Sequence, residues 1–190
     1  MVALVTDLAL DELAYSLGKK LESAGWIIGT AESCTGGLVA RTLTERSGSS
    51  AWFDRSVVTY SNASKAALLG VPEAIFDMFG AVSEQCASKM ALGLLAQLGI
   101  TRGATDWKPA IAVSVTGIAG PTGEVPSKPV GTVCFGCALR TANGFERVET
   151  TTRHFPGDRA AVRLQAAMYA LEFAAKNFQN PGFEQTTALA

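Results

Sequence analysis

The order of strand and helix patterns in this chain predicts an α/β fold: a three-layer α/β/α sandwich with a mostly parallel, mixed sheet of about five strands. Up to residue 115, short apolar runs typical of buried strands alternate with segments whose apolar residues recur at helical spacing. That alternation favours parallel strands joined by helices. Beyond residue 129, two strand patterns flank Asn143-Gly144, a dipeptide typical of a tight hairpin, which adds one antiparallel strand.

The first elements are two helices around a short strand. A helix is expected over residues 8–24, because its leucines recur on one face and Gly25 follows as a stop. Trp26–Ile28 is a short apolar run next to glycine and predicts a buried strand. A second amphipathic helix is expected to begin at Leu38.

The middle of the chain predicts one strand and three helices. Val57–Tyr60 indicates the strand, with Phe53 as the alternative start. Serine, asparagine and proline favour helix starts, and a glycine follows each end. On these signals the helices are expected from Ser61 or Asn62 to Leu69, from Pro72 to about Phe79, and from Ser83 to Leu98.

A long loop precedes the predicted hairpin. Residues 100–109 are expected to be a connection, and Ala110–Val115 is apolar enough to be a strand buried on both faces. Residues 116–129 are rich in glycine and proline, and structureless loops of this length are commonly functional. The hairpin strands are expected over residues 130–139 and 146–152.

The last predicted helix begins near Gly157-Asp158. We assign residues 1–176 to a single domain. Residues 177–190 are polar and unpatterned, which predicts a frayed tail.

Composition excludes several classes of protein. The 190 residues carry a net charge of −1, and their Lys and Arg are scattered, so no basic stripe indicates a nucleic-acid groove. No stretch approaches the roughly 20 apolar residues of a membrane span, and no signal-peptide pattern opens the chain. We therefore expect a cytoplasmic protein that binds neither nucleic acid nor membrane.

Cysteine and histidine usage argues against metal chemistry. Cys134 and Cys137 form a C-x-x-C pattern, but positions three apart in a strand point to opposite faces. His154 is the one histidine, so a zinc site built from histidines is excluded. We expect no cofactor and no metal.

The turn Thr30–Gly37 carries the hydroxyls of Ser33 and Thr35, a thiol and a carboxylate between the first strand and the second helix. Gly36 and Gly37 would let a ligand approach the backbone, and the N–H groups of the helix's first turn would favour an anion or oxyanion. The alternative is an ordinary helix start with Ser33 or Thr35 as the N-cap.

Three loops are expected to meet at one edge of the sheet. Right-handed crossovers bring the carboxyl ends of parallel strands together, and ligands bind outside those ends. The loops are 33–37, 60–65 and 116–123. Their polar residues are Ser33, Thr35, Tyr60, Asn62, Lys65 and Thr116.

A hydroxyl nucleophile needs a base, and lysine is the best candidate in a chain with so little histidine. Lys65 lies in the first turn of its helix, where the dipole disfavours a positive charge. The alternative is an exposed lysine capped by Asn62. Cys34 competes with Ser33 as nucleophile, but adjacent side chains of an extended turn point apart, and we favour Ser33.

The motifs together resemble the CinA C-terminal-domain family, named after the competence/damage-inducible protein CinA. The likeness covers roughly residues 8–173 and is carried by segments in family order. These segments are Thr30–Gly37, Val57–Lys65, Leu69–Val71, Gly80–Glu84, Thr116–Pro121, Lys128–Val133 and Gly157–Arg163. The loop after Pro121 departs from the family's run of glycines, with Glu124 where glycine is common.

The resemblance implies a nicotinamide-nucleotide amidase, which converts nicotinamide mononucleotide to nicotinate mononucleotide and ammonia by a metal-independent Ser–Lys mechanism. It implies Ser33 as the nucleophile, Lys65 as the general base and Tyr60 as an orienting or relay group. The expected substrate-binding residues are Thr35, Gly36, Gly37, Asn62, Thr116, Gly117, Arg159 and Arg163.

The two arginines have an alternative interpretation as a solvated helix face. A homodimer or higher homo-oligomer is also expected. A nucleotide-binding module without catalysis, and a hydrolase of another amide, stay open as alternative functions.

Overall fold

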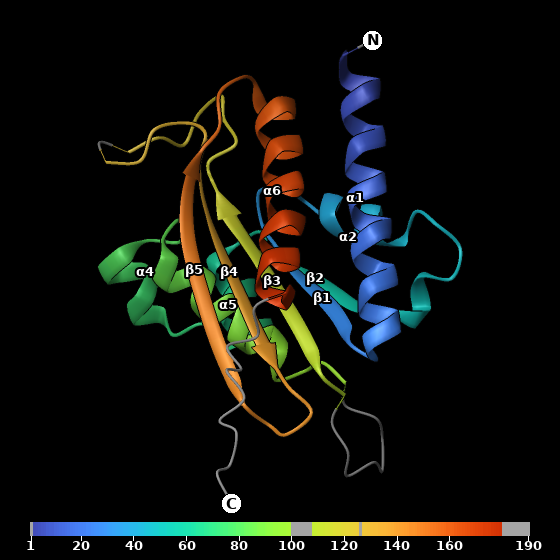
Figure 1. Ribbon diagram of the computed structural model, residues 1–190. Coiled ribbons are helices and arrows are strands. Elements are labelled where there is room, and N and C mark those ends of the chain that lie inside the picture. The colour runs from blue at the N-terminus through green and yellow to red at the C-terminus, as the bar shows by residue number, and fades with distance from the viewer. Residues whose placement is uncertain (1, 100–107, 126, 180–190) are drawn as a thin grey trace, which may run out of the picture.

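A five-stranded sheet lies between two layers of helices (Figure 1). The computed structural model describes residues 2–99, 108–125 and 127–179. The strands are β1 (Ile27–Glu32), β2 (Phe53–Val58), β3 (Ala110–Gly117), β4 (Thr132–Arg140) and β5 (Glu146–His154). The helices are α1 (Val2–Ala24), α2 (Leu38–Thr44), the short 3-10 turn η1 (Ser49–Ala51), α3 (Asn62–Leu69), α4 (Glu73–Phe79), α5 (Glu84–Leu95) and α6 (Arg159–Gln179).

The sheet has the order β2-β1-β3-β4-β5. Strand β1 pairs in parallel with β2 and β3, while β4 pairs antiparallel with both β3 and β5. Only β4 therefore runs against the others, which confirms a mostly parallel sheet with one antiparallel strand. Helices α1, α2 and α6 cover one face, and α3, α4 and α5 lie on the other (Figure 1).

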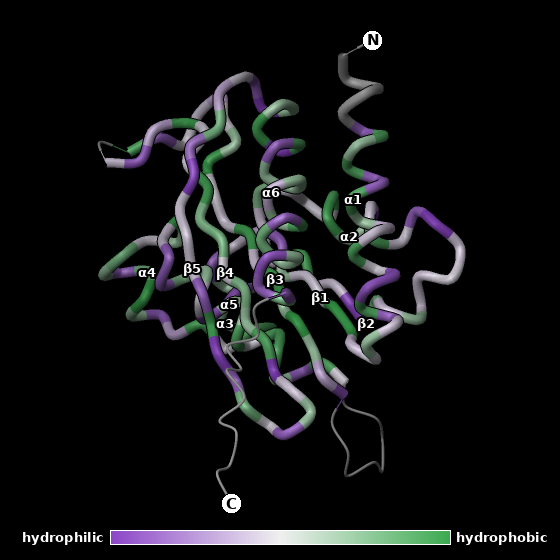
Figure 2. The backbone as a smooth tube through the Cα atoms, in the orientation of Figure 1, coloured by the Kyte–Doolittle hydropathy of each residue, from purple (hydrophilic) through white to green (hydrophobic). Residues whose placement is uncertain are grey.

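The central strands are buried on both faces because each layer of helices covers them. Every residue of β1 and β4 is buried, whereas the edge strand β5 is half-buried or exposed and more polar (Figure 2). One apolar core lies under α1, α2 and α6, and the second lies between the sheet and α5. Cys137 belongs to the first core and Cys134 lies toward α5, which confirms that the C-x-x-C pair is split across the strand.

Helix α3 packs against α5 at a glycine. A Cβ on Gly93 of α5 would lie 1.8 Å from the carbonyl oxygen of Leu69, the last residue of α3. Only glycine allows this separation. The contact therefore sets how closely α3 and α5 approach each other.

Several element boundaries differ from the sequence prediction. Strand β1 does not stop at Ile28, because Gly29–Glu32 continue to pair with β3 as far as Val115. Strand β2 begins at Phe53, the alternative start, and ends at Val58. Interstrand pairing, which a local pattern does not contain, sets these limits.

The C-terminal boundary also lies later than predicted. Helix α6 continues through Gln179, and Asn177 is buried, donating to the carbonyl of Phe173 and accepting from Arg147. Residues 177–179 therefore belong to the helix. The rest of the predicted tail, 180–190, and residues 100–107 of the predicted connection lie outside the described residues.

No helix in the described ranges is both long and apolar enough to cross a bilayer.

Candidate active site

The three predicted loops meet in one pocket of about 270 Å³ at the carboxyl ends of β1, β2 and β3. The α4–α5 connection and the start of α6 complete its walls. The pocket is lined by Ser33, Cys34, Tyr60, Asn62, Lys65, Ala81, Val82, Thr116–Gly120, Thr122, Gly123 and Arg159. The predicted convergence of the loops at this edge is confirmed.

Ser33 and Lys65 are joined by a hydrogen bond inside this pocket. The Nζ of Lys65 lies 3.1 Å from the Oγ of Ser33 and donates to the carbonyl oxygen of Thr59 at 2.7 Å. Lys65 is only 1% exposed, so the alternative of an exposed surface lysine is wrong. The helix that carries it starts at a capping box between Ser61 and Ser64, which fixes where Lys65 leaves the backbone.

Burial lowers the pKa of Lys65 from its ordinary value, because desolvation disfavours the ammonium form. None of the ion pairs between described residues gives Lys65 a carboxylate to offset that effect. A neutral amine next to a serine hydroxyl can accept its proton, as a general base does.

Cys34 is a poorer nucleophile than its neighbour. Its thiol is buried against the core, and burial raises the pKa of Cys34 to about 12. The thiolate, which is the reactive form, is therefore scarce near neutral pH. The preference for Ser33 rests on this difference and on its contact with Lys65.

Tyr60 and Arg159 meet at the mouth of the pocket. The Tyr60 side chain is exposed, and its hydroxyl accepts a hydrogen bond of 2.8 Å from Nη2 of Arg159. Nη1 of the same guanidinium donates to the carbonyl oxygen of Gly120 at 2.9 Å. Within the described residues, the Tyr60 hydroxyl bonds to neither Ser33 nor Lys65.

Asn62, Thr116 and Gly117 also line the pocket, as predicted. Asn62 is exposed at the rim. The hydroxyl of Thr116 donates to the carbonyl of Ala81 at 2.8 Å, which ties β3 to the α4–α5 connection. Thr116 thus holds one wall of the pocket in place.

The other predicted binding residues lie behind the Ser33 turn instead of in the pocket. Thr35 is fully buried, and its carbonyl accepts a hydrogen bond of 2.8 Å from Nη2 of Arg163. A Cβ on Gly36 would approach that guanidinium to 3.3 Å. Arg163 therefore contacts the turn, while Arg159, one helical turn earlier, faces the pocket.

The start of α2 is not the anion site that the sequence suggests. The carboxylate of Glu32 accepts hydrogen bonds from the N–H groups of Gly37, Val39 and Ala40, at 2.9, 3.2 and 2.8 Å. Glu32 occupies the place that a bound anion would take. The N-cap is Gly37, without a side-chain cap, so the alternative with Ser33 or Thr35 as cap is also wrong.

Sequence reasoning missed the role of Glu32, which it noted only as a carboxylate in the turn. The available signal was an acidic residue at the end of an otherwise apolar strand, five positions before Gly37. A buried carboxylate needs donors, and the nearest unpaired donors are those of the following helix.

The model of the CinA C-terminal domain matches residues 10–178. The chain belongs to the CinA C-terminal domain family. The nicotinamide-nucleotide amidohydrolase PncC of Enterobacter agglomerans is 50% identical over 169 residues, which are 89% of this chain and 95% of the relative. The protein of the same name from Escherichia coli K12 is 46% identical over 168 residues, which are 88% and 94% of the two chains.

A solved structure supports the CinA-domain fold. The competence damage-inducible protein A of Klebsiella pneumoniae matches with a TM-score of 0.77 and 34% identity over 90% of this chain and 97% of that one. The loop after Pro121 contributes Thr122 and Gly123 to the pocket, whereas Glu124 is exposed and does not line it.

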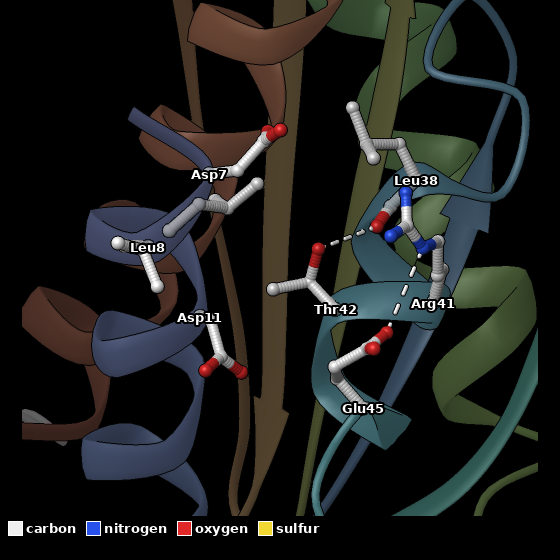
Figure 3. A pocket seen from close by; sticks show the side chains of 8 residues that line it. Asp7, Leu8, Asp11, Leu38, Arg41, Thr42 and Glu45 are labelled. Carbon is white, nitrogen blue, oxygen red and sulfur yellow. Dashed lines mark hydrogen bonds and ion pairs between the residues drawn. The ribbon is translucent and has the colours of Figure 1, made fainter. Parts of the chain in front are cut away.

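A second hollow of this CinA domain, about 310 Å³, lies between α1 and α2 (Figure 3). Among the residues that line this hollow, Thr42 donates its hydroxyl hydrogen to the carbonyl of Leu38. Arg41 forms an ion pair with Glu45 at 3.6 Å. No lysine or cysteine lines it. This hollow therefore lacks the serine–lysine contact that is present in the pocket at Ser33.

Proposed function

We propose that this protein is a nicotinamide-nucleotide amidohydrolase that converts nicotinamide mononucleotide to nicotinate mononucleotide and ammonia. The observation that carries the proposal is the hydrogen bond between the buried Lys65 amine and the Ser33 hydroxyl in the pocket. The names of the relatives, which are 46–50% identical over most of the chain, support the class of substrate.

The first half of the reaction forms an acyl-enzyme. The neutral Lys65 amine takes the proton of Ser33, whose Oγ attacks the carboxamide carbon. Collapse of the tetrahedral intermediate breaks the C–N bond, and the Lys65 ammonium returns its proton to the leaving nitrogen, which departs as ammonia. In the second half, Lys65 deprotonates a water that attacks the ester, which releases the carboxylate and restores Ser33.

The developing oxyanion needs donors other than the start of α2, which Glu32 occupies. The N–H group of Cys34, a residue that lines the pocket, directly follows Ser33 and donates to no backbone carbonyl within the described residues. We assign this N–H group as a donor to the oxyanion, because a backbone donor beside a nucleophile is suited to that charge.

The proposed phosphate ligand is Arg159, because it is exposed at the mouth of the pocket, whereas Arg163 does not line the pocket. Tyr60 and Asn62 lie on the same rim and would contact the ribosyl part. Assembly into a homo-oligomer and location in the cytoplasm stay predictions of the sequence.

We expect Arg159→Ala to raise the KM for nicotinamide mononucleotide about 10- to 100-fold, the effect of losing one hydrogen bond to a charged group. Nicotinamide riboside, which lacks the phosphate, should show no such change between the two enzymes. Arg55→Ala, an exposed arginine at β2 that pairs with Asp54, is the control. An equal loss with both substrates would contradict a phosphate contact.

The test of the function is ammonia release from nicotinamide mononucleotide in the presence of EDTA. The proposal expects turnover that the chelator does not diminish. Retained binding of the nucleotide without ammonia release would favour the non-catalytic binding module. Turnover of other carboxamides in preference to this one would favour a different amidase.

A further inference from the structure

The carboxylate of Glu32 joins the end of β1 to the start of α2, on either side of the turn that carries the proposed nucleophile. Glu32 is the last residue of β1 and is fully buried. Its side chain reaches across the turn to the N–H groups of Gly37, Val39 and Ala40 and also accepts from the hydroxyl of Thr30 at 3.1 Å. Ser33 lies inside the loop that these bonds close.

The rest of the Ser33 backbone is held by neighbours on each side. Its N–H donates to the carbonyl of Val115 in β3, and its own carbonyl accepts from Gly36 at 3.0 Å. The Glu32 carbonyl accepts from the N–H of Thr59 at 2.8 Å, and the Thr59 carbonyl in turn accepts from Lys65. Glu32 is thus bonded through its side chain to the helix after Ser33 and through its backbone to the segment that contacts Lys65.

The partners of the Glu32 carboxylate are backbone N–H groups at the start of α2 instead of a cationic side chain. None of the ion pairs found among the described residues includes Glu32. Backbone donors and the positive end of the helix dipole stabilise a carboxylate at this position. An amide of the same size would present N–H groups to N–H groups and could not accept all of these bonds.

We propose that Glu32 is a positioning residue that acts through Ser33. Its carboxylate fixes the turn so that Oγ of Ser33 stays within reach of the Lys65 amine. This deepens the proposed amidohydrolase function and rests on it for the reaction, but the geometry of the Ser33–Lys65 pair is testable without that substrate.

The first measurement is the rate at which a fluorophosphonate labels Ser33. In this step the serine oxygen forms a bond to phosphorus, the phosphorus–fluorine bond breaks, and Lys65 takes the serine proton as fluoride leaves. The experiment compares Glu32→Gln and Glu32→Asp with the wild type and uses mass spectrometry to identify the labelled residue. We expect the labelling rate to fall about 10- to 100-fold in Glu32→Gln.

The second measurement is turnover of nicotinamide mononucleotide per labelled active site. We expect kcat to fall with the labelling rate while KM changes less than about threefold. Leu21→Ala is the matched control, because it opens a cavity in the α1 core and lowers the melting temperature without contacting the turn. The control should keep its kcat per active site.

Several outcomes would overturn the inference. If a folded Glu32→Gln or Glu32→Asp keeps the wild-type labelling rate and kcat per active site, Glu32 only caps the helix and does not position Ser33. A change in KM alone would lead to the same conclusion. If Glu32→Gln does not fold, Glu32→Asp replaces it in the test. Its carboxylate is one methylene shorter in reach, and the same labelling rate and kcat are measured. A wild type labelled at Ser33 but inactive on the nucleotide would reject the proposed substrate only, whereas a wild type unlabelled at Ser33 would reject the positioning role.

Discussion

Ser33→Ala is expected to lower kcat for nicotinamide mononucleotide by about 10³-fold or more, because it removes the atom that forms the acyl-enzyme. The fold should survive, since among the described residues the Ser33 side chain has a single hydrogen-bond partner, the amine of Lys65. Ammonia release, normalised to protein that retains the wild-type circular dichroism spectrum, is the measurement.

Cys34→Ala is the matched control for this change. It removes a neighbouring side chain that also lines the pocket, yet its thiol is protonated near neutral pH and should not carry the reaction. We expect kcat within about threefold of the wild type. The opposite pattern, with activity kept in Ser33→Ala and lost in Cys34→Ala, would identify the cysteine as the nucleophile.

Lys65→Met is expected to lower kcat by about 10²- to 10⁴-fold, the usual contribution of a general base. Lys65→Arg should be similarly impaired, because a guanidinium keeps the positive charge but does not give up its proton. In the wild type, kcat/KM should rise with pH through a pKa that desolvation holds below the ordinary lysine value of 10.5. A lysine variant that retained both activity and this pH dependence would show that another group is the base.

The lowered pKa of Lys65 also predicts a pH-dependent effect on stability. Between the folded and unfolded pKa values the unfolded chain binds more protons, so the free energy of unfolding rises with pH across that interval. The destabilisation caused by burying the amine is full below the folded pKa and is lost as pH approaches the unfolded value.

Lys65→Met lacks this titration, so its melting temperature minus that of the wild type should become less positive, or more negative, from pH 7 to pH 10. Thermal melts at several pH values measure the difference. A difference that stays constant with pH would contradict a lowered pKa at Lys65.

Local signals in the sequence were sufficient for the layout of the fold and for the meeting of the loops that carry Ser33 and Lys65. The alternation of apolar runs and helical faces determined the α/β/α layers, and Asn143-Gly144 determined the hairpin between β4 and β5. Since parallel strands place their carboxyl ends together, the loops that carry Ser33 and Lys65 had to meet. The spacing of apolar residues and the identity of turn residues involve only positions that are close together in the chain, so both can be read directly from the sequence.

The partner of each polar group was decided only by the tertiary structure. Arg159 and Arg163 are one helical turn apart and equivalent in the sequence, but the packing of α6 places the first at the pocket and the second at the Thr35 carbonyl. The first-turn N–H groups of α2 could have served a substrate, yet the chain folds the Glu32 carboxylate onto them. The lowered pKa of Lys65 comes from desolvation, and burial depends on residues distant in the chain.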